Sequence, residues 1–171
     1  MIWRVSPSRT NSRDGVAENA RKLCEETDYF ICAALSTGHF PLNGYGLLSG
    51  MEKWLTDMKV NPGFYHRLCE KFMECSSPQI DVFYGGVGSY IDAAVIYDDL
   101  GSQTGPLISL SDYREYYKPY QAETIKRIKR HLNPEAKIIL KSGGSVAQFI
   151  PDFIEIGVGV LTPVQPLAKY M

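Results

Sequence analysis

The stretch Ala93–Tyr97 (AAVIY), followed at once by residues 98–103 (DDLGSQ), decides the fold class. Five consecutive apolar residues are typical of a strand that is buried on both faces, as strands of parallel sheets are. Two carboxylates, Asp98 and Asp99, then follow the strand directly, and the amide Gln103 comes a little later. In parallel α/β proteins, ligands bind beyond the carboxyl ends of the strands. The stretch therefore predicts a strand that delivers polar groups to a site, although paired acids can also be ordinary loop residues in contact with water.

The same pattern of an apolar run and a polar end occurs twice more. Residues 138–140 (IIL) are followed by Lys141, Ser142 and a Gly-Gly-Ser turn, and residues 158–161 (VGVL) are followed by TPVQ, which ends in Gln165. Strands of one parallel sheet place their carboxyl ends on the same rim. We therefore predict that one rim gathers six residues, Asp98, Asp99, Gln103, Lys141, Ser142 and Gln165.

Composition limits the class of protein. The chain has 171 residues, 44% of them hydrophobic, with 18 basic and 19 acidic side chains. This balance predicts one globular domain with no electrostatic bias toward nucleic acid or a membrane surface. No apolar run is long enough to cross a bilayer, and the N-terminus lacks the apolar core of a signal peptide. The four cysteines form no CxxC pair, which is typical of reduced cysteines in a cytoplasmic protein. The three histidines fit no metal-ligand spacing.

Helices are expected between the strands. Patterns of apolar residues and capping signals predict five helices. The first two run from Val16 to Thr27 and from Tyr45 to Met58, and the third runs from Asn61 to a break or kink at Pro78. The fourth runs from Ser109 to Asn133 with a division at Pro119, and the fifth runs from Ser145 to a stop at Gly157. Residues 85–88 (GGVG) are expected to form a loop before the strand at 91–97, and a further strand is expected at Tyr29–Leu35. Such alternation predicts a parallel sheet with right-handed crossovers. The amides of the turn at 143–145 could hold an anion or form a tight connection.

The most specific motifs of the chain are residues 98–103 with 113–120, and residues 150–158 with the closing Pro163–Gln165. These segments resemble the uroporphyrinogen decarboxylase superfamily, which includes the cobalamin-dependent and corrinoid-protein methyltransferases. The resemblance extends from about Arg13 to Gln165 and implies a (β/α)8 barrel. A barrel of this kind has eight strands and typically about 250 residues. With four strands predicted, we expect residues 1–171 to form a single partial barrel domain, a central segment of the complete fold.

The resemblance also implies roles for two residues. The stretch from Gly38 places Tyr45 on an active-site tyrosine of the decarboxylases, where a phenol can donate a hydrogen bond to the substrate. The alternative is a helix residue with a solvated hydroxyl. Asp99 falls where the decarboxylases have a serine that contacts a substrate carboxylate. Two facing carboxylates repel each other, so a tetrapyrrole with eight acid groups should bind poorly unless Asp99 is protonated or points elsewhere.

The methyltransferases of this superfamily ligate zinc with a His-x-Cys motif at one strand end. Lys141 and Gly143 occupy these positions in this chain. A protonated lysine cannot ligate zinc and glycine has no side chain, so we predict no metal site. Lys141 could instead be catalytic, or it could pair with Asp98 or Asp99 across neighbouring strands.

These observations give two hypotheses on function. In the first, the chain is part of an enzyme that decarboxylates a porphyrinogen without a cofactor, or that transfers methyl groups with a corrinoid protein, the corrinoid being implied by the resemblance alone. In the second, it is an inactive, truncated or degenerate paralogue with a binding or assembly role. Because the predicted sheet has two free edges, at Tyr29–Leu35 and Val158–Leu161, we also expect self-association. The candidate catalytic residues are Tyr45, Asp98, Asp99 and Lys141, and the candidate substrate-binding residues are Gln103, Ser142, Gly144 and Gln165.

Overall fold

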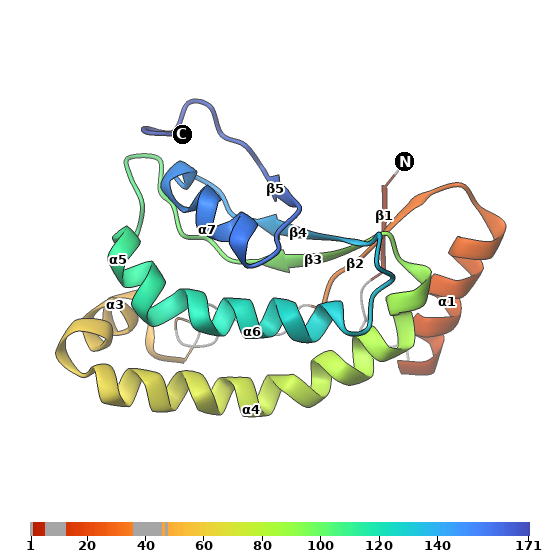
Figure 1. The fold of residues 1–171 in the computed structure, drawn as a ribbon, viewed down its shortest axis with the longest axis horizontal. Coiled ribbons are helices and arrows are strands. Elements are labelled where there is room, and N and C mark those ends of the chain that lie inside the picture. Colours follow the sequence, from red (N-terminus) through yellow and green to blue (C-terminus); the bar gives the residue numbers. More distant parts are fainter. Residues whose placement is uncertain (1, 6–12, 36–45, 47) are drawn as a thin grey trace.

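A parallel sheet of five strands forms the centre of the computed structural model (Figure 1). The structure describes residues 2–5, 13–35, 46 and 48–171, and for residues 2–5, 13 and 14 it describes the backbone alone. The strands follow one another in chain order: β1 (Ile2–Val5), β2 (Phe30–Ala33), β3 (Ala93–Tyr97), β4 (Lys137–Lys141) and β5 (Val160–Thr162). The first of them was not expected. Its four residues, IWRV, are too few to show a hydrophobic period, but the strand pairs with β2 from Ile2 to Val5.

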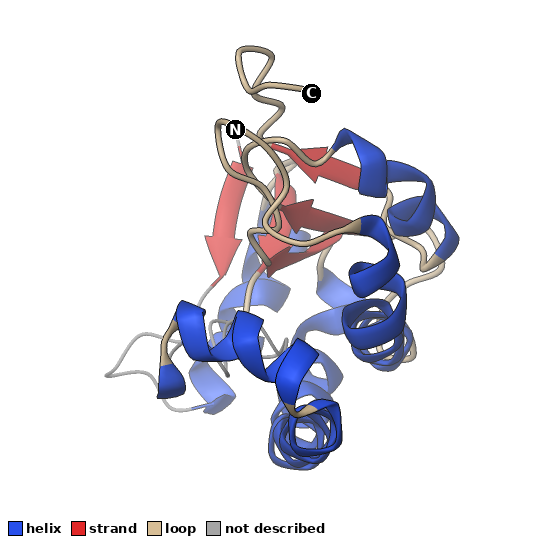
Figure 2. Cartoon of the chain, turned by 90° about the vertical axis from the view of Figure 1, so that its left-hand side faces the viewer, coloured by secondary structure: helices blue, strands red, loops and turns tan. Residues whose placement is uncertain are grey.

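Helices connect the strands: α1 (Arg13–Glu26), α3 (Met51–Val60), α4 (Pro62–Val87), α5 (Leu110–Asp112), α6 (Lys118–Lys129) and α7 (Ile150–Glu155). The long helices α4 and α6 run side by side along the sheet (Figure 1), and the helices gather to one side of it in Figure 2. Within the described residues, no helix is long and apolar enough to cross a membrane. The arrangement is a partial (β/α) barrel, as predicted, with five strands in place of four.

The alternation of side chains along the strands separates a covered face from an open one. Ala94, Ile96 and Leu140 are at most 3% exposed and belong to the core beneath the helices. Their neighbours Val95, Tyr97, Ile139 and Lys141 point to the other face, because successive strand residues alternate. On that face Phe30 is 45% exposed and Val160 is 42% exposed. In a closed barrel this face would be the interior.

Helix α4 corrects the loop expected at 85–88 and excludes a break at Pro78, which was one of the two alternatives there. It continues through Pro78, and residues 85–87 of the expected loop form its last turn. Gly88, the residue after α4, serves close packing instead of a turn: a Cβ atom there would lie 2.1 Å from the carbonyl oxygen of His131, in the turn directly after α6. The predicted start of the helix is confirmed, since the Asn61 side chain accepts a hydrogen bond from the amide of Phe64.

The helices after β3 and β4 also differ in detail. Ser109 caps α5 through the amide of Asp112, as expected. The expected division near Pro119 occurs as a π-helical segment, η2 (Tyr113–Tyr117), immediately before α6. The expected capping box at Ser145 does not form, because the Ser145 amide donates to the carbonyl of Ser102 and α7 begins only at Ile150. Gly157, with φ of 93°, follows α7 as the predicted stop.

Candidate functional site

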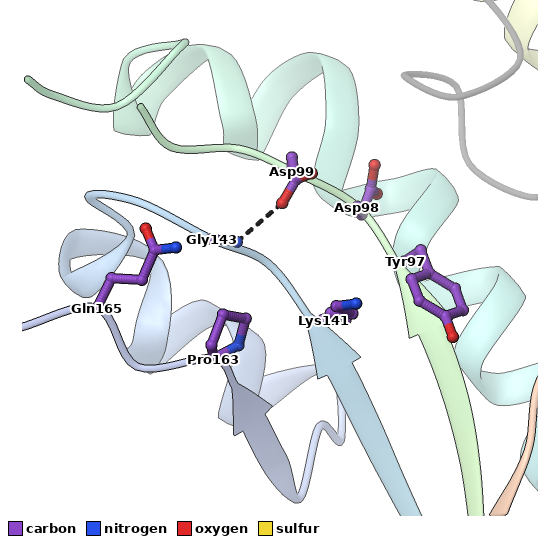
Figure 3. A pocket seen from close by; sticks show the side chains of 7 residues that line it. All are labelled: Tyr97, Asp98, Asp99, Lys141, Gly143, Pro163 and Gln165. Atoms are coloured by element: carbon purple, nitrogen blue, oxygen red, sulfur yellow. Dashed lines mark hydrogen bonds between the residues drawn. The ribbon is translucent and has the colours of Figure 1, made fainter. Parts of the chain in front are cut away.

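The carboxyl ends of β3, β4 and β5 border an open pocket of about 300 Å³ (Figure 3). Its lining comes from all three strand ends: Tyr97, Asp98 and Asp99 after β3, Lys141 and Gly143 after β4, and Pro163 and Gln165 after β5. We call it the strand-end pocket. Four of the six residues predicted to share one rim line it. The register explains why, since Tyr97 lies beside Lys141 and Lys141 lies beside Thr162.

Hydrogen bonds between the loops shape the pocket. Asp99 Oδ1 accepts from the amide of Gly143 at 2.8 Å (Figure 3), and Gln165 Oε1 accepts from the amide of Gly144 at 2.8 Å. Gln165 Oε1 also accepts from Nε2 of Gln103 at 2.7 Å, which brings the fifth predicted residue to the rim. The two glycine amides, which could have held an anion, are therefore already used within the loops.

Ser142, the sixth predicted rim residue, is buried beside the pocket and does not line it. Its hydroxyl accepts a hydrogen bond from the amide of Leu100 at 3.2 Å and so supports the loop that follows β3. A contact of Ser142 or Gly144 with a ligand stays a prediction. Tyr45 lies outside the described residues, so its predicted role also stays a prediction.

Asp98 is a buried acid at the edge of the pocket. Its side chain belongs to a residue that is 1% exposed, and Oδ1 has no hydrogen-bond partner among the described residues. Oδ2 accepts from Gln121 Nε2 at 3.4 Å. Burial raises the pKa of Asp98 well above its usual value, the charge of Asp99 raises it further, and the hydroxyl of Tyr117 and the amide of Gln121 lower it in part. The two adjacent aspartates therefore differ: Asp98 favours the neutral acid, whereas Asp99 is exposed.

Groups on the helices hold Gln121 against Asp98. The hydroxyl of Tyr113 donates to Gln121 Oε1 at 2.6 Å, which directs the Nε2 atom of Gln121 to Asp98. The segment that carries Tyr113 is tied to α7, because Asp152 accepts hydrogen bonds from Arg114 and Lys118. Sequence reasoning did not identify Gln121 or Tyr113. Tyr113 opens the segment 113–120 that resembles the superfamily and Gln121 follows that segment directly, but the π-helical turn between them, Tyr113–Tyr117, has no sequence signal.

Lys141 forms no ion pair with any described residue, so the alternative of a pair with Asp98 or Asp99 is wrong for the described structure. The sheet explains this. Lys141 shares a face with Tyr97, and its Nζ lies 5.4 Å from the centre of that ring, whereas Asp98 is one residue further along and points to the other face. Asp99 is engaged by the Gly143 amide.

The described residues offer no set of side chains that could bind a metal ion. Among the described residues, no three His, Cys, Asp or Glu side chains gather as a metal site. The positions of the zinc-binding His-x-Cys motif carry Lys141 and Gly143 in the strand-end pocket, and neither offers a ligand.

The fold and the pocket define an α/β barrel segment whose polar groups lie at the carboxyl ends of its strands. The family model for uroporphyrinogen decarboxylase (URO-D) matches residues 7–163. The chain therefore belongs to the URO-D family.

One solved structure, a methyltransferase from Methanosarcina mazei, is similar in fold, with a TM-score of 0.60 and 15% sequence identity. The match covers 89% of this chain and 42% of that chain, so this chain spans less than half the length of the methyltransferase. At this identity the likeness shows the fold alone. No curated protein matches the sequence.

Proposed function

We propose that the strand-end pocket is part of the active site of an enzyme that decarboxylates a tetrapyrrole of the porphyrinogen type. The observation that carries this proposal is Asp98, an acid that lines the strand-end pocket, is 1% exposed and has a pKa that burial raises. A raised pKa lets a carboxylic acid keep its proton to higher pH than an ordinary aspartate does, and such an acid can deliver the proton inside a site.

The chemistry needs an acid and no cofactor. Protonation of a pyrrole ring carbon turns the ring into an electron sink, the bond between the side-chain carbon and its carboxylate then breaks, and carbon dioxide leaves while the electron pair neutralises the ring. The exocyclic methylene group that results takes up a proton to become a methyl group, and the ring carbon gives up the proton it had received. Asp98 would supply the proton, and Tyr45, Gln103 and Gln165 would contact the substrate through hydrogen bonds. The repulsion expected between Asp99 and the substrate carboxylates is reduced, because Asp99 Oδ1 accepts a hydrogen bond from the Gly143 amide. This bond directs the Asp99 carboxylate toward the glycine turn.

The second candidate is methyl transfer with a corrinoid protein. The fold of the Methanosarcina mazei methyltransferase favours it at the level of architecture. Against it stands the chemistry of the pocket, since Lys141 and Gly143 cannot hold the zinc ion that activates a thiol. We therefore place decarboxylation first. An inactive paralogue with a binding role is the third reading, and the test below separates all three.

The test is a rate measurement with uroporphyrinogen under reducing conditions, with products separated by their number of carboxyl groups. We expect carboxyl loss by the wild-type chain, and a rate at least about 100-fold lower for Asp98→Asn, because removal of a general acid typically costs a factor of 10² to 10⁴. Glu135→Gln, an exposed residue in the turn before β4, is the control and should leave the rate unchanged.

Three results would contradict the proposal. Transfer of a methyl group from a methylated corrinoid to a thiol, without carboxyl loss, would make the chain a methyltransferase. Neither reaction, in a folded chain that still binds the porphyrinogen, would favour a binding role. Equal rates for the wild type and Asp98→Asn would remove Asp98 as the acid.

A further inference from the structure

We infer that Lys141 anchors a carboxylate group of the ligand in the strand-end pocket, together with the side-chain amide of Gln165. The inference rests on the proposed function only in placing the ligand in this pocket. It adds the chemical class of the group that binds there and the two side chains that receive it.

The first argument comes from the partners of the lining residues. Asp99 accepts from the Gly143 amide, and Gln165 Oε1 accepts from two donors. Asp98 is buried with a raised pKa. Lys141 differs from these groups, because in the described part of the chain its ammonium has neither an ion pair nor a hydrogen bond, only the ring of Tyr97. Among the described residues, the pocket therefore presents a positive charge without a counter-ion.

The second argument concerns the position of the ammonium. Lys141 ends β4 on the open face of the sheet, beside Tyr97 in the register and with an exposed side chain. Figure 3 shows it on the same side of the strands as Tyr97. The Tyr97 ring attracts the ammonium of Lys141 at this distance, and the attraction does not use the N–H donors of the ammonium. No described residue accepts a hydrogen bond from the three N–H groups of the ammonium, so they can donate to a ligand.

The third argument selects a carboxylate over phosphate. Gln165 uses its Oε1 twice, whereas its Nε2 has no hydrogen-bond partner among the described residues. Nε2 lies toward the glycine turn, 3.6 Å from the position of a Cβ on Gly143. One ammonium and one amide N–H suit the two oxygens of a carboxylate. A phosphate would bring more charge close to Asp99, and the glycine amides that could compensate it are occupied.

The experiment is an NMR titration of the 171-residue chain with acetate, acetamide and inorganic phosphate, observed at the Gln165 side-chain amide and the Gly143 backbone amide. We expect saturable shifts with acetate and none with acetamide. Lys141→Gln should weaken acetate binding at least about tenfold, because the ammonium group gives the carboxylate charge-assisted hydrogen bonds that a neutral amide cannot. Lys141→Arg, which keeps the charge, should retain most of the affinity.

Lys137→Gln is the matched control. Lys137 lies on the same strand and the same face as Lys141, but at the other end of the sheet, and should leave acetate binding unchanged. Equal acetate binding by wild type and Lys141→Gln would overturn the inference, and so would tighter, Lys141-dependent binding of phosphate.

The two proposals can fail separately. Lys141-dependent acetate binding by a chain that does not decarboxylate would leave this inference standing and contradict the proposed function. Decarboxylation at an unchanged rate and an unchanged KM in Lys141→Gln would do the reverse.

Discussion

Replacing Gly144 by alanine will distort the strand-end pocket and destabilise the chain by about 3 kcal/mol or more. Gly144 has φ of 74°, in the left-handed region that side chains disfavour. A Cβ atom there would also lie 2.6 Å from the carbonyl carbon of Gly101 and from the carbonyl oxygen of Ser102. Both contacts are with backbone, so the loops after β3 and β4 would have to separate. Denaturant unfolding measures the loss.

Gly105→Ala is the control for this substitution. Gly105 lies in the same loop as Gly101, and a Cβ atom there would meet nothing within 4 Å. We expect its free energy of unfolding to stay within about 0.5 kcal/mol of the wild type. A Gly144→Ala variant as stable as Gly105→Ala would show that the two loops are not packed as described.

The isolated 171-residue chain will self-associate, and Val160→Lys will reduce the association. The described sheet has free edges at β1 and β5, and its open face exposes Phe30 and Val160. Unpaired edges and apolar patches favour contact with another chain, and an edge lysine opposes it. The edge expected at Tyr29–Leu35 is wrong, because β1 pairs with β2 and takes that position. Sedimentation velocity over a range of concentrations gives the oligomeric state.

Val82→Lys provides the comparison. Val82 is 50% exposed on α4, away from the sheet, and the same change there should leave the association of the wild type intact. A wild-type chain that stays monomeric at all concentrations would contradict the account of the open face. So would equal association by both lysine variants.

The strand-end pocket was predictable because its signal is local. An apolar run that stops at a polar residue marks the end of a strand, and parallel strands bring such ends together. Asp98, Asp99, Lys141 and Gln165 were placed together in this way, and the pocket contains all four. The difference between the two aspartates was not predictable. It depends on which face of the sheet each one meets, and therefore on the register and on the helices that cover one face.

The errors share a physical cause. Glycine at 85–88 predicts a loop when the sequence alone is considered, but Gly88 is needed where a helix end meets the carbonyl of His131. Lys141 and the aspartates are complementary in charge, but strand alternation and the Gly143 amide keep them from pairing. In both cases a contact between distant segments decides the outcome, and such contacts leave no mark in the local pattern.

The protonation state of Asp98 tests the central claim most directly. The carbonyl stretch of a protonated carboxylic acid can be followed by infrared spectroscopy, with Asp98→Asn as the reference that removes it. The account predicts that this band persists at neutral pH, well above the pH at which an ordinary aspartate ionises, because burial favours the neutral form of Asp98. Loss of the band as the pH rises through about 4 would contradict it, because Asp98 would then be an ordinary carboxylate with no proton to give.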